Sequence, residues 1–250
     1  MTTMRRILTR ALVAVLLSLP AYGLLAYVVL PVSWRYGRFG GQWTAAGVTR
    51  TAEGIPGDPL NVELVGSLSD VVAAMRAAGW YPADAIGMRS GLRDVASILF
   101  DRPYPSAPVS THFLYGRPQD IAFQRAVGRS PRRRHHVRLW AVGDPSPSPS
   151  HATLWVGAAT FDRTMGISHF TGELMHHIDP DVDKERETLL ADLARTGRLD
   201  GRAYRDREQG AGAAKNGGGD PYFTDGKIVV AKIALCHPER SEGPLSSPER

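Results

Sequence analysis

The chain is poor in cysteine: its single residue of this type, Cys236, lies close to the C-terminal end. An intrachain disulfide is therefore excluded, and the fold depends on its hydrophobic core. The sequence also lacks a Gly-x-Ser-x-Gly turn, and the side chains of the neighbours Ser168 and His169 would point to opposite faces of a strand. Serine-based acyl transfer is therefore not indicated.

A large charge excess is also missing once the N-terminus is set apart. The chain has 30 basic and 25 acidic residues, and three of the basic ones are Arg5, Arg6 and Arg10. Without these three, 27 basic residues face 25 acidic ones, which is a net charge of +2. The high isoelectric point is thus no sign of nucleic-acid binding, and we expect no nucleic-acid partner.

One long stretch has no charged side chain at all. It comprises the 22 residues from Ala11 to Val32, which as a helix would cross the roughly 30 Å hydrocarbon core of a bilayer. A cleaved secretory signal is the alternative, but the small-x-small site Ala21-Tyr22-Gly23 is poor and the apolar run continues past it. The pattern favours an uncleaved signal-anchor.

The flanking cations indicate an orientation for this anchor. Arg5, Arg6, Arg10 and the terminal amine precede the span, whereas Arg35 and Arg38 follow it. Because positive charge is retained in the cytoplasm, we expect a cytoplasmic N-terminus and an extracytoplasmic domain. The prediction is a single-pass membrane protein of the bacterial envelope.

The remaining sequence predicts one α+β domain with a largely antiparallel sheet and about three helices. We expect residues 1–33 to hold the anchor, 34–58 a juxtamembrane linker, 59–235 the domain, and 236–250 a disordered polar tail. Patterns of two-residue and helical period give the elements. The expected strands are 60–65, 109–115, 121–127, 136–142, 153–161, 173–178 and 227–235, and the expected helices are 69–78, 91–100 and 180–196.

Particular residues mark the turns and the helix ends. Residues 116–120 predict a hairpin loop between 109–115 and 121–127, and the Pro/Ser tract 143–150 joins 136–142 to 153–161. Ser69 is expected to cap the first helix, which Gly79 ends. Asp179 is expected to cap the last helix, with Pro180 at its first position and Gly197 after its end.

Charge is segregated along the chain. Six arginines and no acid lie between Arg125 and Arg138, whereas seven acids and only two bases lie between Glu173 and Asp192. The two blocks could pair across the fold, remain solvated surfaces, or leave the basic block to face anionic lipid or a phosphate-bearing ligand. The candidate ligand-binding residues are Arg132, Arg133, Arg134, His135, His136 and Arg138.

Two further segments contain residue types that could bind a metal or a phosphate. In an extended strand His177 and Asp179 would share a face, which is half of a metal site, and His112, His136 or His169 would have to supply the third ligand. Because capping accounts for Asp179, we expect neither a metal nor another cofactor. The glycine-rich loop at 215–220 resembles no Walker A sequence and is expected to be a connector rather than a phosphate site.

Four separated segments, in order, carry a resemblance to a known family. They are YGRPQDIAFQRAVGRSPRRRHHVRLW at 115–140, GAATFD at 157–162, HHIDPDVDKER at 176–186 and NGGGDPYFTDG at 216–226. Over residues 59–233 the chain resembles the LssY C-terminal-domain-like family. That resemblance implies a domain appended to membrane proteins, some of lipid-phosphatase type, without an established activity of its own. This chain lacks the phosphatase signatures, so that activity is not carried over.

These observations predict a membrane-anchored accessory or binding module that contacts anionic lipid or a partner membrane protein. The alternative is a hydrolase that acts on a phosphate-bearing or lipid substrate with Asp/His chemistry and an arginine clamp. A cleft that the arginine block shares with His136 and His177 would favour the hydrolase. An arginine block lying open near the membrane-proximal segment would favour lipid contact.

Overall fold

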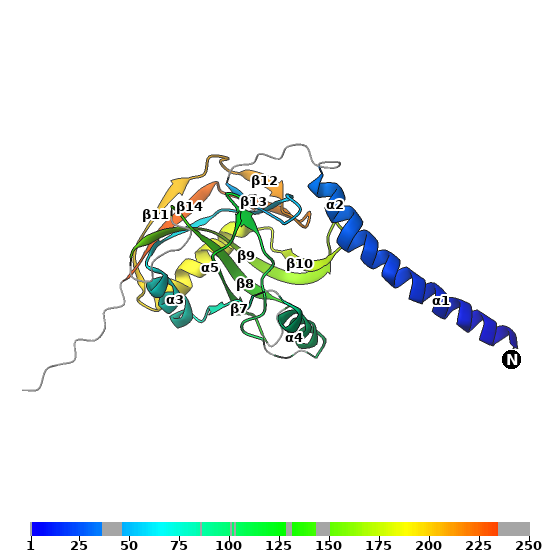
Figure 1. Cartoon of the computed structure of the whole chain (residues 1–250). Helices are drawn as coiled ribbons and strands as arrows, with labels where there is room; N and C mark the ends of the chain where they lie inside the picture. The colour runs from blue at the N-terminus through cyan, green and yellow to red at the C-terminus, as the bar shows by residue number, and fades with distance from the viewer. Residues whose placement is uncertain are drawn as a thin grey trace, which may run out of the picture.

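A long N-terminal helix leads into a mixed domain built on a twisted sheet (Figure 1). The computed structural model describes residues 2–36, 47–85, 87–100, 102, 104–128, 132–143 and 151–234. The helical stretch runs through α1 (Thr2–Leu24), a π-helical turn η1 (Leu25–Val29) and α2 (Leu30–Arg35). Within the described residues, Met4–Arg35 is the one helix long and apolar enough to cross a membrane. Its Leu12, Leu16 and Leu19 are exposed, unlike the side chains of a core helix.

The main sheet of the domain has seven strands in a continuous order and one further strand at its side. In spatial order they are β11 (Leu199–Asp206), β14 (Lys227–Ile233), β3 (Val62–Gly66), β9 (Thr153–Ile167), β8 (Arg134–Ala141), β7 (Ile121–Ala126) and β4 (Tyr81–Pro82). Strand β10 (Leu174–Ile178) pairs with the far part of β9. Neighbours are antiparallel except β14 and β3, which confirms the predicted α+β class.

One face of this sheet carries the main hydrophobic core. Helices α3 (Leu68–Ala77) and α5 (Val182–Arg195) pack on it, and a third helix, α4 (Met88–Leu99), lies at the β7 end of the domain (Figure 1). Fully buried side chains from both helices and the strands meet there, because alternate strand residues point to one face. They include Met75, Trp80, Phe123, Val137, Trp155, Leu189 and Val229.

The opposite face is covered by smaller pieces of sheet. One is a four-stranded sheet in the order β2 (Pro56–Pro59), β1 (Val48–Arg50), β5 (Phe113–Leu114) and β6 (Arg117–Pro118). The other is the hairpin of β12 (Gly212–Lys215) and β13 (Pro221–Thr224). A second apolar cluster, which includes Leu114, Trp140 and Val156, lies between the four-stranded and the main sheet.

Two of the predicted loops differ from the structure. Strand β1 lies inside 34–58, which was expected to be a linker, and β2 overlaps its end, because these short extended segments pair with each other and β1 also pairs with β5. The expected hairpin of 109–115 with 121–127 is also wrong. Residues 117–118, expected in its loop, form β6 and pair with β5, whereas β7 pairs with β8. The predicted pairing of 136–142 with 153–161 is confirmed.

Both predicted N-caps are displaced by two residues. Ser67, not Ser69, caps α3: its backbone is extended and its hydroxyl accepts a hydrogen bond from Asp70 N at 3.1 Å. Asp181, not Asp179, caps α5 and accepts from Lys184 N at 3.0 Å. Asp179 instead accepts from Asp181 N at 3.0 Å, so it shapes the turn that enters the helix.

The predicted helix ends are confirmed, since Gly79 and Gly197 follow α3 and α5 with positive φ. Some predictions concern residues outside those that the structure describes, and they stay predictions. They concern Arg38, Arg129, part of the Pro/Ser tract at 144–150, Cys236 and the tail at 236–250.

Candidate functional site

The arginine block is divided by the two-residue period of β8. Arg134, His136 and Arg138 share the face of the main sheet that is turned away from α3 and α5, and they are only 4%, 2% and 3% exposed. Strand β9 brings their partners by register: Asp162 lies opposite Arg134, and Thr160 lies opposite His136. We call these five residues with Asp58 and His112 the buried polar cluster.

Hydrogen bonds tie the buried polar cluster together. Arg134 Nε donates to Asp162 Oδ2 at 2.8 Å, and Arg138 Nη1 donates to Asp58 Oδ2 at 2.7 Å. The same Arg138 nitrogen donates to His136 Nε2 at 2.8 Å, and Thr160 Oγ1 lies 2.8 Å from that Nε2. Because Nε2 accepts from a guanidinium, the proton of a neutral His136 belongs on Nδ1, which lies 3.3 Å from Asp162 Oδ2.

Burial decides the protonation of the two cluster histidines. It lowers the pKa of His136, and although Asp162 opposes this, the nearby Arg138 lowers the pKa further. Burial and then Arg138 lower the pKa of His112 to about 3. Burial alone would raise the pKa of Asp162, but the neighbouring His136, His176 and Arg134 hold it well below the ordinary value. At neutral pH the cluster therefore contains neutral imidazoles and two charged pairs.

Both guanidiniums give most of their N–H groups to the protein. Beyond its carboxylate, Arg134 donates to Pro108 O, to Gln124 Oε1 and toward His176 Nδ1. Arg138 donates to the backbone oxygen and to the hydroxyl of Ser110. Each arginine is thus compensated by one buried carboxylate and fixed by further acceptors, which is a structural arrangement rather than an open clamp.

The other members of the arginine block lie elsewhere. His135 points to the opposite face, where its Nδ1 lies 2.8 Å from Glu185 Oε2, and Arg125 pairs with Asp192 at 2.9 Å. Both acids belong to α5, so for these residues the structure shows the first of the alternatives, in which the two charge blocks pair across the fold. Arg132 and Arg133 are exposed beyond the start of β8, and the guanidinium of Arg133 lies 5.8 Å from the Phe161 ring.

A cleft of about 700 Å³ opens over the buried polar cluster. Its wall joins four parts of the chain: the segment after β1, the approach to β5, the β9–β10 end and the loop before β13. Representative lining residues are Thr51, Glu53, Ser110, His112, Arg134, His136, Arg138, Asp162, Glu173, His176 and Gly217. Tyr27 of the N-terminal helix also lines it, so the cleft adjoins that helix.

Two acids of the cleft have no ion-pair partner among the described residues: Glu53 and Glu173. Burial raises the pKa of Glu173, the hydroxyl of Thr171 lowers it, and the carboxylate of Glu53 raises it again. Glu53 therefore acts on Glu173 as a like charge. A positively charged group between the two carboxylates would relieve both burial and repulsion.

The N-terminal helix is bonded to the turn between β9 and β10. Tyr22 donates its hydroxyl to Gly172 O, and Tyr27 Oη accepts from Leu174 N at 3.1 Å. Trp34 donates from Nε1 to Phe170 O at 3.3 Å, and the rings of these two residues are 5.2 Å apart. Three side chains of the helix therefore fix the β9–β10 turn, and with it one wall of the cleft.

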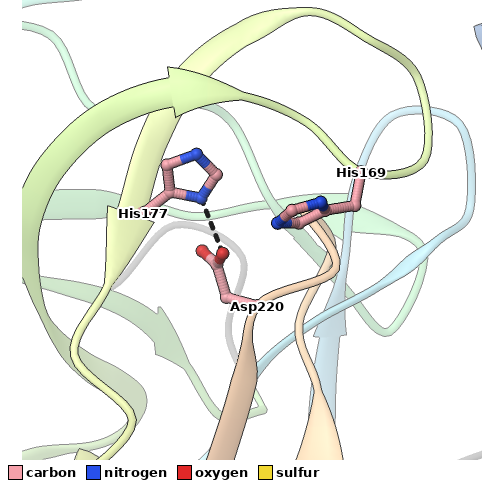
Figure 2. A group of neighbouring side chains, drawn as sticks. All are labelled: His169, His177 and Asp220. Atoms are coloured by element: carbon pink, nitrogen blue, oxygen red, sulfur yellow. Dashed lines mark hydrogen bonds and ion pairs between the residues drawn. The ribbon is translucent and has the colours of Figure 1, made fainter.

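A second cluster lies beside the cleft and consists of His169, His177 and Asp220 (Figure 2). One nitrogen of each imidazole and one oxygen of the carboxylate all lie within 4.8 Å of one another. His177 Nδ1 and Asp220 Oδ1 are hydrogen-bonded at 2.6 Å. His177 and His169 were expected as candidate ligands, but Asp179 is not in the cluster, because Asp220 occupies the position expected for it.

Comparison with known sequences decides the family. The profile described as the LssY C-terminus matches residues 42–228, which is more than half of the chain. The chain belongs to the LssY C-terminus family. No curated protein and no solved structure matches it.

The motifs that suggested the LssY C-terminus family supply residues of both clusters. Asp162 ends GAATFD, His177 lies in HHIDPD, and Asp220 lies in NGGGDPYF. Sequence reasoning assigned no role to Asp58, Asp162 or Asp220. The alternation of Arg134, His136 and Arg138 was a usable signal for buried carboxylates, because three such side chains on one strand face need partners. No local pattern places Asp220 beside His177.

Proposed function

We propose that this LssY C-terminus protein is a membrane-anchored binding module that takes the headgroup of a phospholipid into the cleft beside its anchor. The length and apolar character of Met4–Arg35 support a span, and the cations Arg5, Arg6 and Arg10 support a cytoplasmic N-terminus with the domain outside. The cleft is within the size range of small-ligand sites. Its ligand is then a molecule of the membrane surface.

Contacts between the helix and the domain support this placement. Tyr27 and Trp34, near the end of the apolar run, bond the β9–β10 turn, whose neighbours Ile167 and Leu174 are 55% and 58% exposed. Exposed apolar side chains beside a spanning helix fit the interfacial region of a bilayer, where tyrosine is also favoured. The cleft wall formed by this turn would then be level with the lipid headgroups.

The observation that carries the proposal is a pair of carboxylates, Glu53 and Glu173, that have no ion-pair partner among the described residues and lie in the same cleft as two buried guanidiniums. Arg134 and Arg138 are already compensated by Asp162 and Asp58, so the cleft has no spare positive charge for an anion alone. A headgroup with an ammonium beside its phosphate suits this arrangement, because the ammonium compensates the two glutamates. The proposed ligand is therefore a zwitterionic lipid such as phosphatidylethanolamine, in place of the anionic lipid expected from the sequence.

The test is a titration of the detergent-solubilised full chain with short-chain phosphatidylethanolamine and phosphatidylglycerol. We expect the ethanolamine lipid to bind more tightly, and the double variant Glu53→Gln/Glu173→Gln to weaken it at least tenfold. Glu208→Gln is the matched control, since Glu208 is exposed and does not line the cleft. Tighter binding of phosphatidylglycerol would restore the anionic-lipid hypothesis. No binding of either lipid would favour a partner membrane protein.

A further inference from the structure

The cluster of His169, His177 and Asp220 joins three segments that are distant in sequence. His169 lies in the turn that follows β9, His177 lies in β10, and Asp220 directly precedes β13. Figure 2 shows the three side chains converging from these segments. Two imidazoles and one carboxylate are a donor set that divalent transition metals prefer.

Asp220 is a buried carboxylate without a permanent cation. The residue is only 3% exposed. Among the described residues, His177 is the one basic group within ion-pair distance of its carboxylate. The second oxygen, Oδ2, accepts from Ile178 N at 3.1 Å. A buried charge needs compensation, and a neutral imidazole supplies only a hydrogen bond. A bound metal ion would supply the missing positive charge.

The backbone holds these residues in place before any ligand arrives. Asn216 Oδ1 accepts from Gly218 N at 3.0 Å and from Asp220 N at 2.9 Å, which closes the loop before β13. His169 N donates to Gly218 O at 2.9 Å, so this loop is bonded to the turn that carries His169. The hydrogen bond from Ile178 N to Oδ2 fixes the Asp220 carboxylate and leaves Oδ1 facing His177.

Glycine at 166 sets the orientation of the His177 ring. A Cβ at this position in β9 would collide with His177 Nε2, so the ring lies where a side chain would otherwise be. Nε2 is thereby turned to β9 and Nδ1 to Asp220. A second close approach occurs at Gly219, which has φ of +85° and would meet His169 Cβ at 2.7 Å if it carried a Cβ. Both glycines let the three segments come together.

We propose that this cluster binds one divalent transition-metal ion, with Zn²⁺ as the reference ion. The ligands are His177 Nδ1, one oxygen of Asp220, one ring nitrogen of His169 and a water molecule. Tetrahedral zinc with bonds near 2.1 Å brings ligand atoms to about 3.4 Å from one another. Metal binding therefore opens the 2.6 Å contact between His177 Nδ1 and Asp220 Oδ1 by about 0.8 Å, and the exposed His169 moves inward to supply the third ligand atom.

The metal would connect the β9–β10 turn to the loop before β13. That turn also bonds Tyr22 and Tyr27 of the N-terminal helix, so the ion would stiffen the join between helix and domain. None of the three metal ligands lines the cleft, so the metal and the headgroup are bound by different residues.

The experiment measures zinc in the detergent-solubilised full chain after chelator treatment and re-addition of Zn²⁺. We expect about one bound ion per chain by mass spectrometry, and visible absorption bands when Co²⁺ replaces Zn²⁺. His169→Ala removes an exposed ligand and should weaken zinc binding at least tenfold without loss of fold. Asp220→Asn should do the same, and His151→Ala is the matched control, because His151 is exposed and outside the cluster.

Two results would overturn the proposal. One is a folded chain that binds less than a tenth of an equivalent at micromolar free zinc. The other is unchanged zinc affinity in His169→Ala. Thermal melting of each variant, with and without zinc, shows whether the variant is folded. If Asp220→Asn is not folded, the zinc affinity of His169→Ala alone tests the proposal. We expect zinc to raise the melting temperature of the unchanged chain and of His151→Ala, but not that of His169→Ala.

Discussion

The buried polar cluster and the His169–His177–Asp220 cluster both combine histidine with aspartate, but they differ in how the charge of the carboxylates is compensated. In the first, Asp58 and Asp162 each have an arginine within 2.8 Å. In the second, His177 is the one ion-pair partner of Asp220 among the described residues. The charge of a carboxylate paired with a guanidinium is compensated within the fold. A carboxylate that is hydrogen-bonded only to a neutral imidazole keeps its charge, which a bound cation can compensate. The comparison separates structural histidine–aspartate contacts from those open to a ligand.

The same distinction applies inside the cleft. Arg134 and Arg138 were expected to hold a ligand, but their N–H groups are mostly used by the protein, and the unpartnered charges of the cleft are Glu53 and Glu173. A count of arginines along the sequence therefore does not give the residual charge of the cleft. Compensation within the fold has to be known before the residual charge of a site can be read.

The largest effect is expected from breaking a compensated pair. Asp162→Asn leaves Arg134 buried without its carboxylate, and this should lower the free energy of unfolding by about 3–5 kcal/mol. Urea denaturation of the detergent-solubilised chain, followed by tryptophan fluorescence, measures the change. Asp200→Asn breaks the exposed pair with Lys232 and should cost at most about 1 kcal/mol. Equal losses in the two variants would contradict the structural role of the buried pair.

A second prediction uses acid to test the neutral histidines of the buried polar cluster. The unfolded chain protonates His112 near pH 6.5, whereas the folded chain resists protonation until its pKa of about 3. Stability from this group is therefore complete above pH 6.5 and declines as the pH falls toward 3. His136, whose pKa is also lowered, acts in the same direction.

We expect His112→Gln to reduce the slope of unfolding free energy against pH by about 1.4 kcal/mol per pH unit between pH 6 and 4.5. Denaturation curves at several pH values give this slope. The exposed His151 provides the control, because its replacement by Gln removes a histidine without touching the cluster. Parallel pH curves for the unchanged chain and His112→Gln would show that His112 is not held neutral by the fold.

Local patterns predicted the fold well and the sites poorly. Strand alternation located β8 and β10, and glycines located the ends of α3 and α5, because these features depend on neighbours in sequence. The pairing of 117–118 with β5 escaped prediction, since two-residue strands have no period. Asp162 reaches Arg134 across 28 residues and Asp220 reaches His177 across 43, so both contacts depend on the strand register of the whole sheet.

The smallest effect is expected at the N-terminus of α5, where Asp181 rather than Asp179 is the capping residue. Asp181 accepts from Lys184 N, so Asp181→Ala should lower the free energy of unfolding by about 0.5–2 kcal/mol, and Asp181→Asn should cost little. Asp179→Ala loses only a bond within the turn and should cost less than Asp181→Ala. Thermal unfolding with zinc or a chelator extends the test, since neither aspartate belongs to the metal cluster. The zinc-dependent shift in melting temperature should be the same in all three variants, and a shift lost in Asp179→Ala would return that residue to the metal site in place of Asp220.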